Sequence, residues 1–186
     1  MKKKLLAFIL AAVCVITAVP AAAVTEPPVL AEAATKRAPS INKVYSAVKD
    51  AYGDDYLPSV RLEEDEIKAR YGISSKWYTS AIAEVPMINV HVDTLVIVKA
   101  KNAESKKKIK KALVDYRKSL IDDTNQYPMN QLKIQASKVY VKGSYVCFFM
   151  LGTLDAGQEE KEESKVIEAY KKLNNKAVNA VKKLYK

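Results

Sequence analysis

Residues 138–151 read Lys-Val-Tyr-Val-Lys-Gly-Ser-Tyr-Val-Cys-Phe-Phe-Met-Leu. The apolar and aromatic residues on either side of Gly143-Ser144 predict two strands, 138–142 and 145–151, joined as a hairpin. A glycine at the first position of a two-residue loop suits a type II′ turn. Because the second strand is apolar on both of its faces, we expect it to lie in the centre of its sheet.

Another strand is predicted upstream of this hairpin. From residue 88 to residue 100 every even-numbered residue except Thr94 is apolar, whereas most odd-numbered residues are polar. This alternation predicts a strand with one buried face, ordered from about 94 to 101. A helix is predicted to follow over 103–122, because apolar residues recur there at spacings of three and four: Ile109, Leu113, Tyr116 and Leu120.

Three short helices are predicted before the first strand. Residues 41–52 follow Ser40, which suits an N-cap, and a second helix begins among the acidic residues 63–66. A third begins after residue 74 or 75 and is ended by Pro86. Residues 122–135 are interpreted as a polar loop. Three helices followed by β-α-β-β predict an α+β domain over residues 40–152, with two layers and a small, mainly antiparallel sheet.

Residues 153–186 are predicted to form a long, charged C-terminal helix. Acidic residues gather at its start and lysines at its end, which matches the helix dipole. Its apolar stripe needs a cover and can dock on the domain, lie on a membrane surface as a peripheral contact, or pair with a partner. The stripe consists of Val166, Tyr170, Leu173, Ala177, Val181 and Leu184.

The N-terminus has the layout of a secretory signal peptide. Three lysines precede an apolar run over residues 5–19, and Pro20 and three alanines follow it. We expect cleavage after Ala23, a flexible linker over residues 24–39, and an exported protein that is extracellular or associated with the cell surface. The alternative is an uncleaved membrane anchor, although the run is shorter than the roughly 20 residues that span a bilayer. A lipoprotein is disfavoured because Val13, before Cys14, is not a small residue.

The chain is basic, with 31 Lys and Arg against 21 Asp and Glu, and a net charge of +10. On an exported protein this charge favours an anionic partner such as a wall polymer. Five lysines near the start of helix 103–122 are the first candidate site, since a helix N-terminus disfavours cations and helix stability does not explain them. A solvated helix face is the alternative. The five are Lys106, Lys107, Lys108, Lys110 and Lys111.

The polar loop after this helix is the second candidate site. Its amides and its aromatic ring suit recognition of a sugar or a peptide. The alternative is an ordered connection whose side chains cap the helix end. The candidate residues are Asp123, Asn125, Tyr127 and Asn130.

Several chemistries lack the residues they need. His91 is the single histidine, and with Asp93 it makes half of a catalytic triad, but no Gly-x-Ser-x-Gly elbow supplies a nucleophile. Cys147 lies among apolar residues, where a thiolate is disfavoured. No zinc spacing, EF-hand loop or glycine-rich phosphate loop is present. We therefore predict no catalytic residues, no metal site and no cofactor. The alternative is a hydrolase or acyl-transfer accessory enzyme that uses His91 and Asp93.

Several segments together resemble the domain-of-unknown-function 4358 family of exported proteins and lipoproteins from Gram-positive anaerobes. They are residues 50–53 and 56–58, Pro86 to Thr94, 98–101, Gln126 to Asn130, 133–137 and 143–149. The resemblance covers roughly residues 40–152. It implies an envelope-facing domain with no established activity, encoded near membrane-bound O-acyltransferases. It transfers no catalytic residue.

Together these features favour a non-enzymatic, exported binding or accessory domain of the cell envelope. Its partner would be an anionic envelope polymer, such as a cell-wall polyanion, or an envelope enzyme of surface-polymer O-acylation. Nucleic acid is disfavoured, because no reader motif is present and the compartment is wrong.

Overall fold

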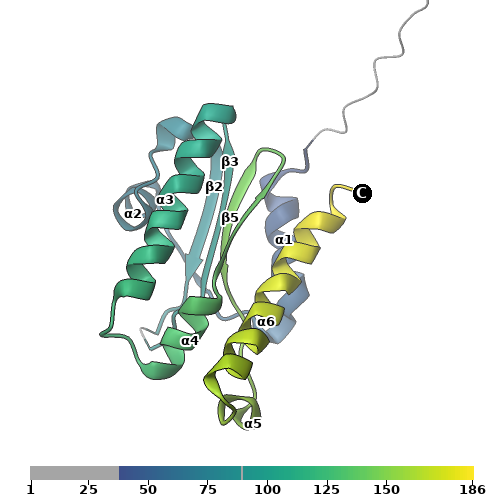
Figure 1. Cartoon of the computed structure of the whole chain (residues 1–186). Helices are drawn as coiled ribbons and strands as arrows, with labels where there is room; N and C mark the ends of the chain where they lie inside the picture. The colour runs from purple at the N-terminus through teal and green to yellow at the C-terminus, as the bar shows by residue number, and fades with distance from the viewer. Residues whose placement is uncertain (1–37, 89) are drawn as a thin grey trace, which may run out of the picture. The chain divides into compact units, whose positions relative to one another are not determined.

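The computed structural model describes residues 38–88 and 90–186, which form a five-stranded sheet with helices packed on it (Figure 1). The predicted signal peptide and most of the predicted linker lie outside the described residues. The strands are β1 (Val60–Arg61), β2 (Tyr78–Val85), β3 (Thr94–Ala100), β4 (Lys138–Lys142) and β5 (Tyr145–Met150). The helices are α1 (Ile41–Tyr52), α2 (Glu64–Tyr71), α3 (Ala103–Asp122), α4 (Pro128–Ala136), α5 (Ala156–Glu159) and α6 (Glu163–Lys183), with 3-10 turns η1 (Gly53–Asp55) and η2 (Ser75–Trp77).

The sheet has the order β1-β2-β3-β5-β4, and all neighbouring strands are antiparallel. β5 lies between β3 and β4 and buries all six of its residues, which confirms its predicted central position. The predicted hairpin across Gly143-Ser144, the strand that begins at Thr94 and the helix over 103–122 are also confirmed.

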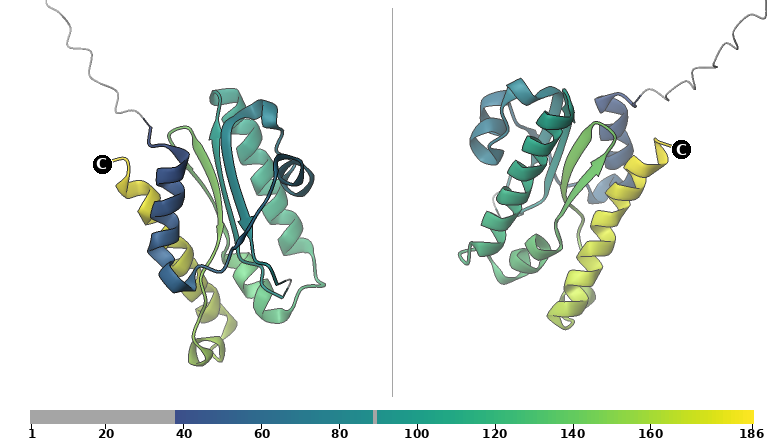
Figure 2. Two further views of the ribbon diagram at one scale, coloured as in Figure 1. Left: turned by 180° about the vertical axis from the view of Figure 1, so that it is seen from behind. Right: turned by 45° about the horizontal axis from the view of Figure 1, so that its top comes forward.

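Helices cover both faces of the sheet. Alternate residues of β3 and β5 point to opposite sides. One set, including Val96 and Phe148, packs against α2 and α3. The other, including Ile97 and Phe149, packs against α1 and α6. Figure 2 shows the helices on either side of the strands. The α+β class is confirmed, but the layers number three rather than the expected two, because the C-terminal helix joins α1 on the second face.

The prediction of a third helix is wrong, because residues 78–85 form β2. Ala81, Ala83 and Val85 recur with period two and face the core beneath α3. Two of these three are alanines, which favour helices by propensity, so the pattern was ambiguous. Pairing with β1 on one side and β3 on the other satisfies the backbone of this segment and overrides the propensity.

Glu84 of β2 anchors the segment that leads from α1 into the sheet. Its side chain is buried, and it accepts hydrogen bonds from the Tyr45 hydroxyl at 3.1 Å and the Tyr56 hydroxyl at 2.7 Å. Arg61 adds an ion pair at 2.8 Å. Burial, followed by the bond to Glu84, raises the pKa of Tyr56, so this hydroxyl remains a donor. The cluster is fully satisfied internally and is structural.

The predicted polar loop over residues 122–135 is also partly wrong, because α4 occupies Pro128–Ala136. Pro128 stands in the first turn of the helix, where its missing N–H costs no hydrogen bond. Leu132, Ile134 and Ala136 are buried. Arg117 of α3 holds the end of α4 by donating to the carbonyl oxygens of Ser137 and Gln135 at 2.9 and 2.7 Å.

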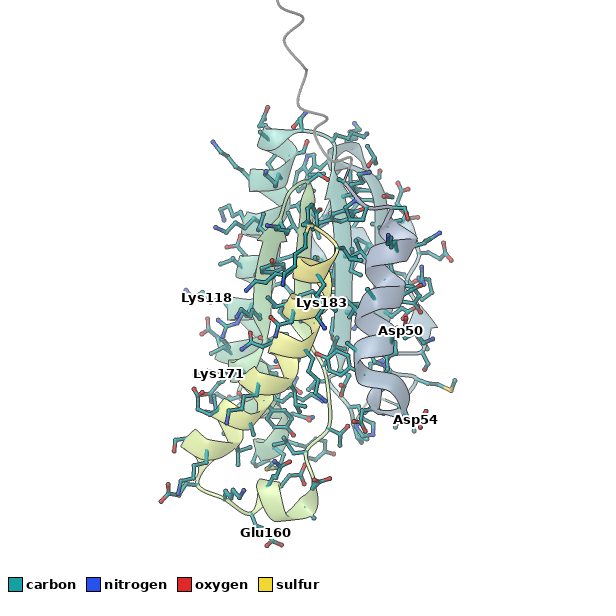
Figure 3. All side chains as sticks on the ribbon, turned by 90° about the vertical axis from the view of Figure 1, so that its right-hand side faces the viewer. Asp50, Asp54, Lys118, Glu160, Lys171 and Lys183 are labelled. Carbon is teal, nitrogen blue, oxygen red and sulfur yellow. The ribbon has the colours of Figure 1, made fainter. Side chains whose placement is uncertain are left out.

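The C-terminal helix docks on the domain, the first of its three predicted arrangements. Figure 3 shows α6 beside α1 over the sheet, with Lys171 and Lys183 on α6 and Asp50 and Asp54 at α1. The buried residues of α6 are Val166, Tyr170, Asn174, Ala177, Val178 and Val181. A short break separates α5 from α6, so the residues beyond 157 do not form one continuous helix. Among the described residues, no helix is both long and apolar enough to cross a membrane.

Asn174 explains how a polar residue fits into this apolar stripe. The side chain is fully buried, its Oδ1 accepts from the Leu151 amide at 3.0 Å, and its Nδ2 donates to the Ala136 carbonyl at 3.0 Å. One bond satisfies a backbone amide just past the end of β5, and the other satisfies the carbonyl of the last residue of α4. They fix the position of α6 along the ends of β5 and α4.

A buried carboxylate joins the same region. Asp93 is fully buried, and its Oδ2 lies 2.5 Å from Lys133 Nζ of α4, while its Oδ1 accepts from the Gly152 amide at 3.2 Å. Gly152 has φ +95°, and a Cβ there would lie 3.1 Å from Leu173, so only glycine suits this position. The ammonium of Lys133 also lies 5.5 Å from the centre of the Tyr170 ring. One carboxylate therefore connects β3, α4 and the start of the C-terminal segment.

Removing this carboxylate should destabilise the fold strongly. Asp93→Ala leaves the Lys133 ammonium buried without a counter-charge, and such losses cost about 3–5 kcal/mol in the free energy of unfolding. The pair Asp93→Asn with Lys133→Met should recover most of that loss. Denaturant unfolding with circular dichroism measures both variants. Lys111→Met, which breaks an exposed ion pair, is the control and should change stability far less. Equal effects of Asp93→Ala and Lys111→Met would contradict this account.

Removal of residues 156–186 should abolish cooperative unfolding, because it uncovers the sheet face that contains Leu95, Ile97 and Phe149. Thermal unfolding followed by circular dichroism gives the measurement. Lys171→Ala with Lys183→Ala alters only the outer face of α6 and should unfold like the unaltered chain. A truncated chain with a sharp transition at the original temperature would show that α6 is an appendage.

Candidate functional site

A groove of about 510 Å³ lies between α2, η2 and α3, and we call it the α2–α3 groove. Its volume is within the range of about 300–1,000 Å³ that is usual for ligand sites. It contains an aromatic wall and a basic rim. The lining residues are Arg70, Tyr71, Gly72, Trp77, Lys108, Lys111, Ala112, Asp115, Tyr116 and Ser119.

Local sequence signals position the two sides of this groove. Gly72 adopts the left-handed conformation that ends α2, with φ 66°. The Ser74 hydroxyl then caps η2, which brings Trp77 to the rim of the sheet. The α3 side is built from residues 108, 111, 112, 115, 116 and 119, whose spacings of three and four place them on one face of the helix.

The aromatic wall is rooted in the core. The Tyr71 and Tyr116 rings meet edge to face with centroids 4.7 Å apart, and Tyr116 contacts Phe148 of β5 at 5.5 Å. These contacts fix the ring orientations before any ligand arrives, which lowers the cost of binding.

The hydroxyl of Tyr71 is buried and has no hydrogen-bond partner among the residues that the structure describes. The whole residue is only 2% exposed. Burial, and then the neighbouring Tyr116, raise the pKa of this hydroxyl, and the nearby charge of Arg70 opposes the shift. Because this hydroxyl is closed off from solvent, it belongs to the core beneath the groove and is not open to a ligand.

The basic rim consists of Arg70, Lys108 and Lys111. The Arg70 side chain is exposed and forms no ion pair or hydrogen bond with any residue that the structure describes. The two lysines form exposed pairs along α3, Lys108 with Glu104 at 2.7 Å and Lys111 with Asp115 at 2.6 Å. Hydrogen bonding to Lys108 lowers the pKa of Glu104. Because exposed pairs of this kind are weak, an anionic ligand can compete for both lysines.

The structure divides the five lysines of the first predicted site. Lys108 and Lys111 line the α2–α3 groove, and Lys108 Nζ lies 6.0 Å from the centre of the Trp77 ring. Lys106 instead donates to the Gly143 carbonyl oxygen at 3.1 Å, which ties α3 to the β4–β5 hairpin. Lys107 and Lys110 are exposed and do not line the groove.

The second predicted site lies past the far end of α3, whose 20 residues span about 30 Å. Asp123 accepts from the Asn125 amide and from Gln126 Nε2, each at 3.0 Å, and these bonds lower its pKa. Asn130 Nδ2 donates to the Val90 carbonyl at 3.0 Å, and Tyr127 is 67% exposed. The Asp123 carboxylate thus orders the connection between α3 and α4, and the two predicted sites do not merge into one.

A smaller cavity of about 220 Å³ adjoins the groove, and we call it the His91 cavity. Arg70 and Tyr116 line both spaces. His91 is exposed and forms no side-chain hydrogen bond with a described residue, while Asp93 is occupied by Lys133 and Gly152. Both residues line this cavity, but among the described residues no hydrogen bond joins the His91 ring to the Asp93 carboxylate, which is the contact that the hydrolase alternative requires.

The remaining reactive groups do not form a site. Cys147 is fully buried, and burial raises the pKa of its thiol. In residues 38–88 and 90–186, no cluster of three His, Cys, Asp or Glu side chains is placed to hold a metal ion.

Sequence reasoning missed Arg70, Tyr71 and Trp77. Trp77 was assigned to a helix that does not form, and Tyr71 reads as a core residue of α2. The one available signal was the spacing of Lys108, Lys111 and Asp115, which separates these residues from Lys107 and Lys110 on α3.

One family matches the chain. A domain of unknown function (DUF4358) matches residues 51–151. No curated protein and no solved structure matches. The matched segment contains every residue that lines the α2–α3 groove, while α6 and most of α1 lie outside it.

Tyr71→Phe removes the buried hydroxyl that lacks a partner. We expect the free energy of unfolding to rise by about 1 kcal/mol, because the desolvation cost of an unsatisfied donor disappears. Urea unfolding measures the difference. Tyr140→Phe, at a half-buried ring on β4, is the control for loss of a hydroxyl. A destabilised Tyr71→Phe variant would show that the hydroxyl has a partner in solution.

Proposed function

The chain belongs to the DUF4358 family, whose description gives no activity, and we propose that it is a non-enzymatic binding domain for an anionic polysaccharide of the cell envelope. The observation that carries this proposal is the α2–α3 groove. In one open space it combines a fixed aromatic wall, two lysines and an arginine that has no ion pair with a described residue.

Each part of the groove suits one part of such a ligand. The rings of Trp77 and Tyr116 offer apolar surface to the face of a sugar ring. Arg70 presents a planar fork of donors that matches a carboxylate or a phosphate, and Lys108 and Lys111 add positive charge beside it.

The envelope location in this proposal rests on residues 1–23. Their basic start, apolar run and small residues are those of a secretory signal peptide. An exported basic domain meets anionic wall and surface polymers directly, and its charge draws them to the groove. A role beside the O-acylation machinery of such polymers is compatible with a domain that holds the polymer without reacting with it.

An envelope protein is the second candidate partner, and a separate observation favours it. Met87, Ile88 and Tyr127 are 76%, 61% and 67% exposed. The bond from Asn130 to the Val90 carbonyl joins the two segments that carry them. Exposed apolar residues that gather in this way mark protein contacts. Met87→Ser with Tyr127→Ser should abolish such a contact and leave polysaccharide binding unchanged, because neither residue lines the α2–α3 groove or the His91 cavity.

Trp77 is the single tryptophan of the chain, so its fluorescence reports directly on the groove. We expect titration with polygalacturonate to change the emission, with an affinity that falls as salt rises from 0.01 M to about 1 M, where the Debye length is about 3 Å. Lys108→Gln with Lys111→Gln should weaken binding about tenfold, close to 1.4 kcal/mol.

The matched control is Lys107→Gln with Lys110→Gln, which removes the same charge from the same helix but outside the groove. It should weaken binding less than about threefold, because screened exposed charges contribute little. Equal losses in the two double variants would mean that α3 acts as a diffuse basic surface. No fluorescence response at low salt would overturn the proposed function.

A further inference from the structure

The α2–α3 groove and the His91 cavity adjoin at two side chains. Arg70 and Tyr116 line both spaces, one on α2 and one on α3. The two spaces therefore follow one another along α3, from Lys108 near its start to Leu120 near its end. Their volumes are about 510 and 220 Å³. A ligand with repeating units fits such a succession better than a single compact molecule.

The chemistry of the two spaces differs. The α2–α3 groove has the aromatic wall and two lysines, whereas the His91 cavity adds polar groups from other segments: His91, Asp93, Thr94 and Gln126. The Asp93 carboxylate is paired with the Lys133 ammonium. Thr94 Oγ1 donates to the Val92 carbonyl, and Gln126 Nε2 donates to Asp123, so both of these donors are used. The Gln126 side-chain oxygen and the His91 ring have no hydrogen bond to a described residue, so both can bind a ligand.

Arg70 stands where the two spaces meet, and it has no anion of its own. Its guanidinium carries five donors and a full positive charge, with no ion pair to any described residue. Its charge opposes the burial that raises the pKa values of the Tyr71 and Tyr116 hydroxyls, which places it near both rings. An exposed arginine where two cavities meet is placed to bind an acidic group at the point where one unit of a ligand follows another.

We infer that the His91 cavity is a second subsite, so that the protein binds an acidic oligosaccharide across both spaces with an acidic group on Arg70. This inference rests on the proposed function and adds the length of the ligand to it. The first units occupy the α2–α3 groove, and the chain continues past Arg70 toward His91 and Gln126.

A ladder of oligogalacturonates from the dimer to the hexamer tests this inference by isothermal titration and Trp77 fluorescence. We expect the hexamer to bind at least about tenfold more tightly than the dimer. His91→Glu places a negative charge in the second cavity and should reduce hexamer affinity to near that of the dimer, with dimer affinity changed less than about twofold. His91→Gln, which adds no charge, should keep most of the hexamer affinity.

Tyr127→Glu is the matched control, because it adds the same charge at an exposed residue that lines neither space. It should leave the whole ladder unchanged. Dimer binding without a gain for longer chains, or equal losses in His91→Glu and Tyr127→Glu, would overturn the second subsite and leave the proposed function standing. Failure of both dimer and hexamer to bind would overturn the two together.

Discussion

The buried carboxylate of Asp93 is the group that holds α4 and the start of the C-terminal segment against the sheet. It lies at the entry to β3, yet it binds the Lys133 ammonium 40 residues later and the Gly152 amide 59 residues later. A buried charge is tolerated only when it is paired and hydrogen-bonded, and this pairing fixes α4 and the C-terminal segment against the sheet at once. Asn174 then binds the adjoining backbone of Leu151 and Ala136, so α6 closes the same junction.

The two faces of the sheet are covered by different sets of helices. On one face α1 and α6 lie side by side and bury their apolar stripes against β3 and β5. On the other face α3 is accompanied by two short helices, α2 and α4, and by the turn η2. The shorter cover leaves the α2–α3 groove open beside rings that the core holds in place. A rigid scaffold with one incompletely covered face is a general way to build a preformed site.

The local elements with strong periodicity could be predicted from the sequence. Strand β5, apolar on both faces, could only be central, and the stripe of α6 needed a cover that the domain supplies. Strand β2 could not be predicted, because alanines at helical and strand spacing look alike until the neighbouring strands are placed. Of the residues that line the groove, the sequence indicated Lys108 and Lys111. Its other half depends on Arg70, Tyr71 and Trp77, which only the packing of α2 on α3 brings near those lysines. The link between Asp93 and Lys133 is equally non-local, and it occupies the carboxylate that the hydrolase alternative pairs with His91.

The central claim is that one groove, rather than the basic surface as a whole, binds anionic polysaccharide. Amide and indole chemical shifts of the isotope-labelled protein, recorded with and without a galacturonate dimer, test it most directly. The account predicts shifts confined to the Trp77 indole and to residues around Arg70, Lys108 and Lys111. Shifts of similar size along the lysines of the outer face of α6, such as Lys171 and Lys183, would contradict it.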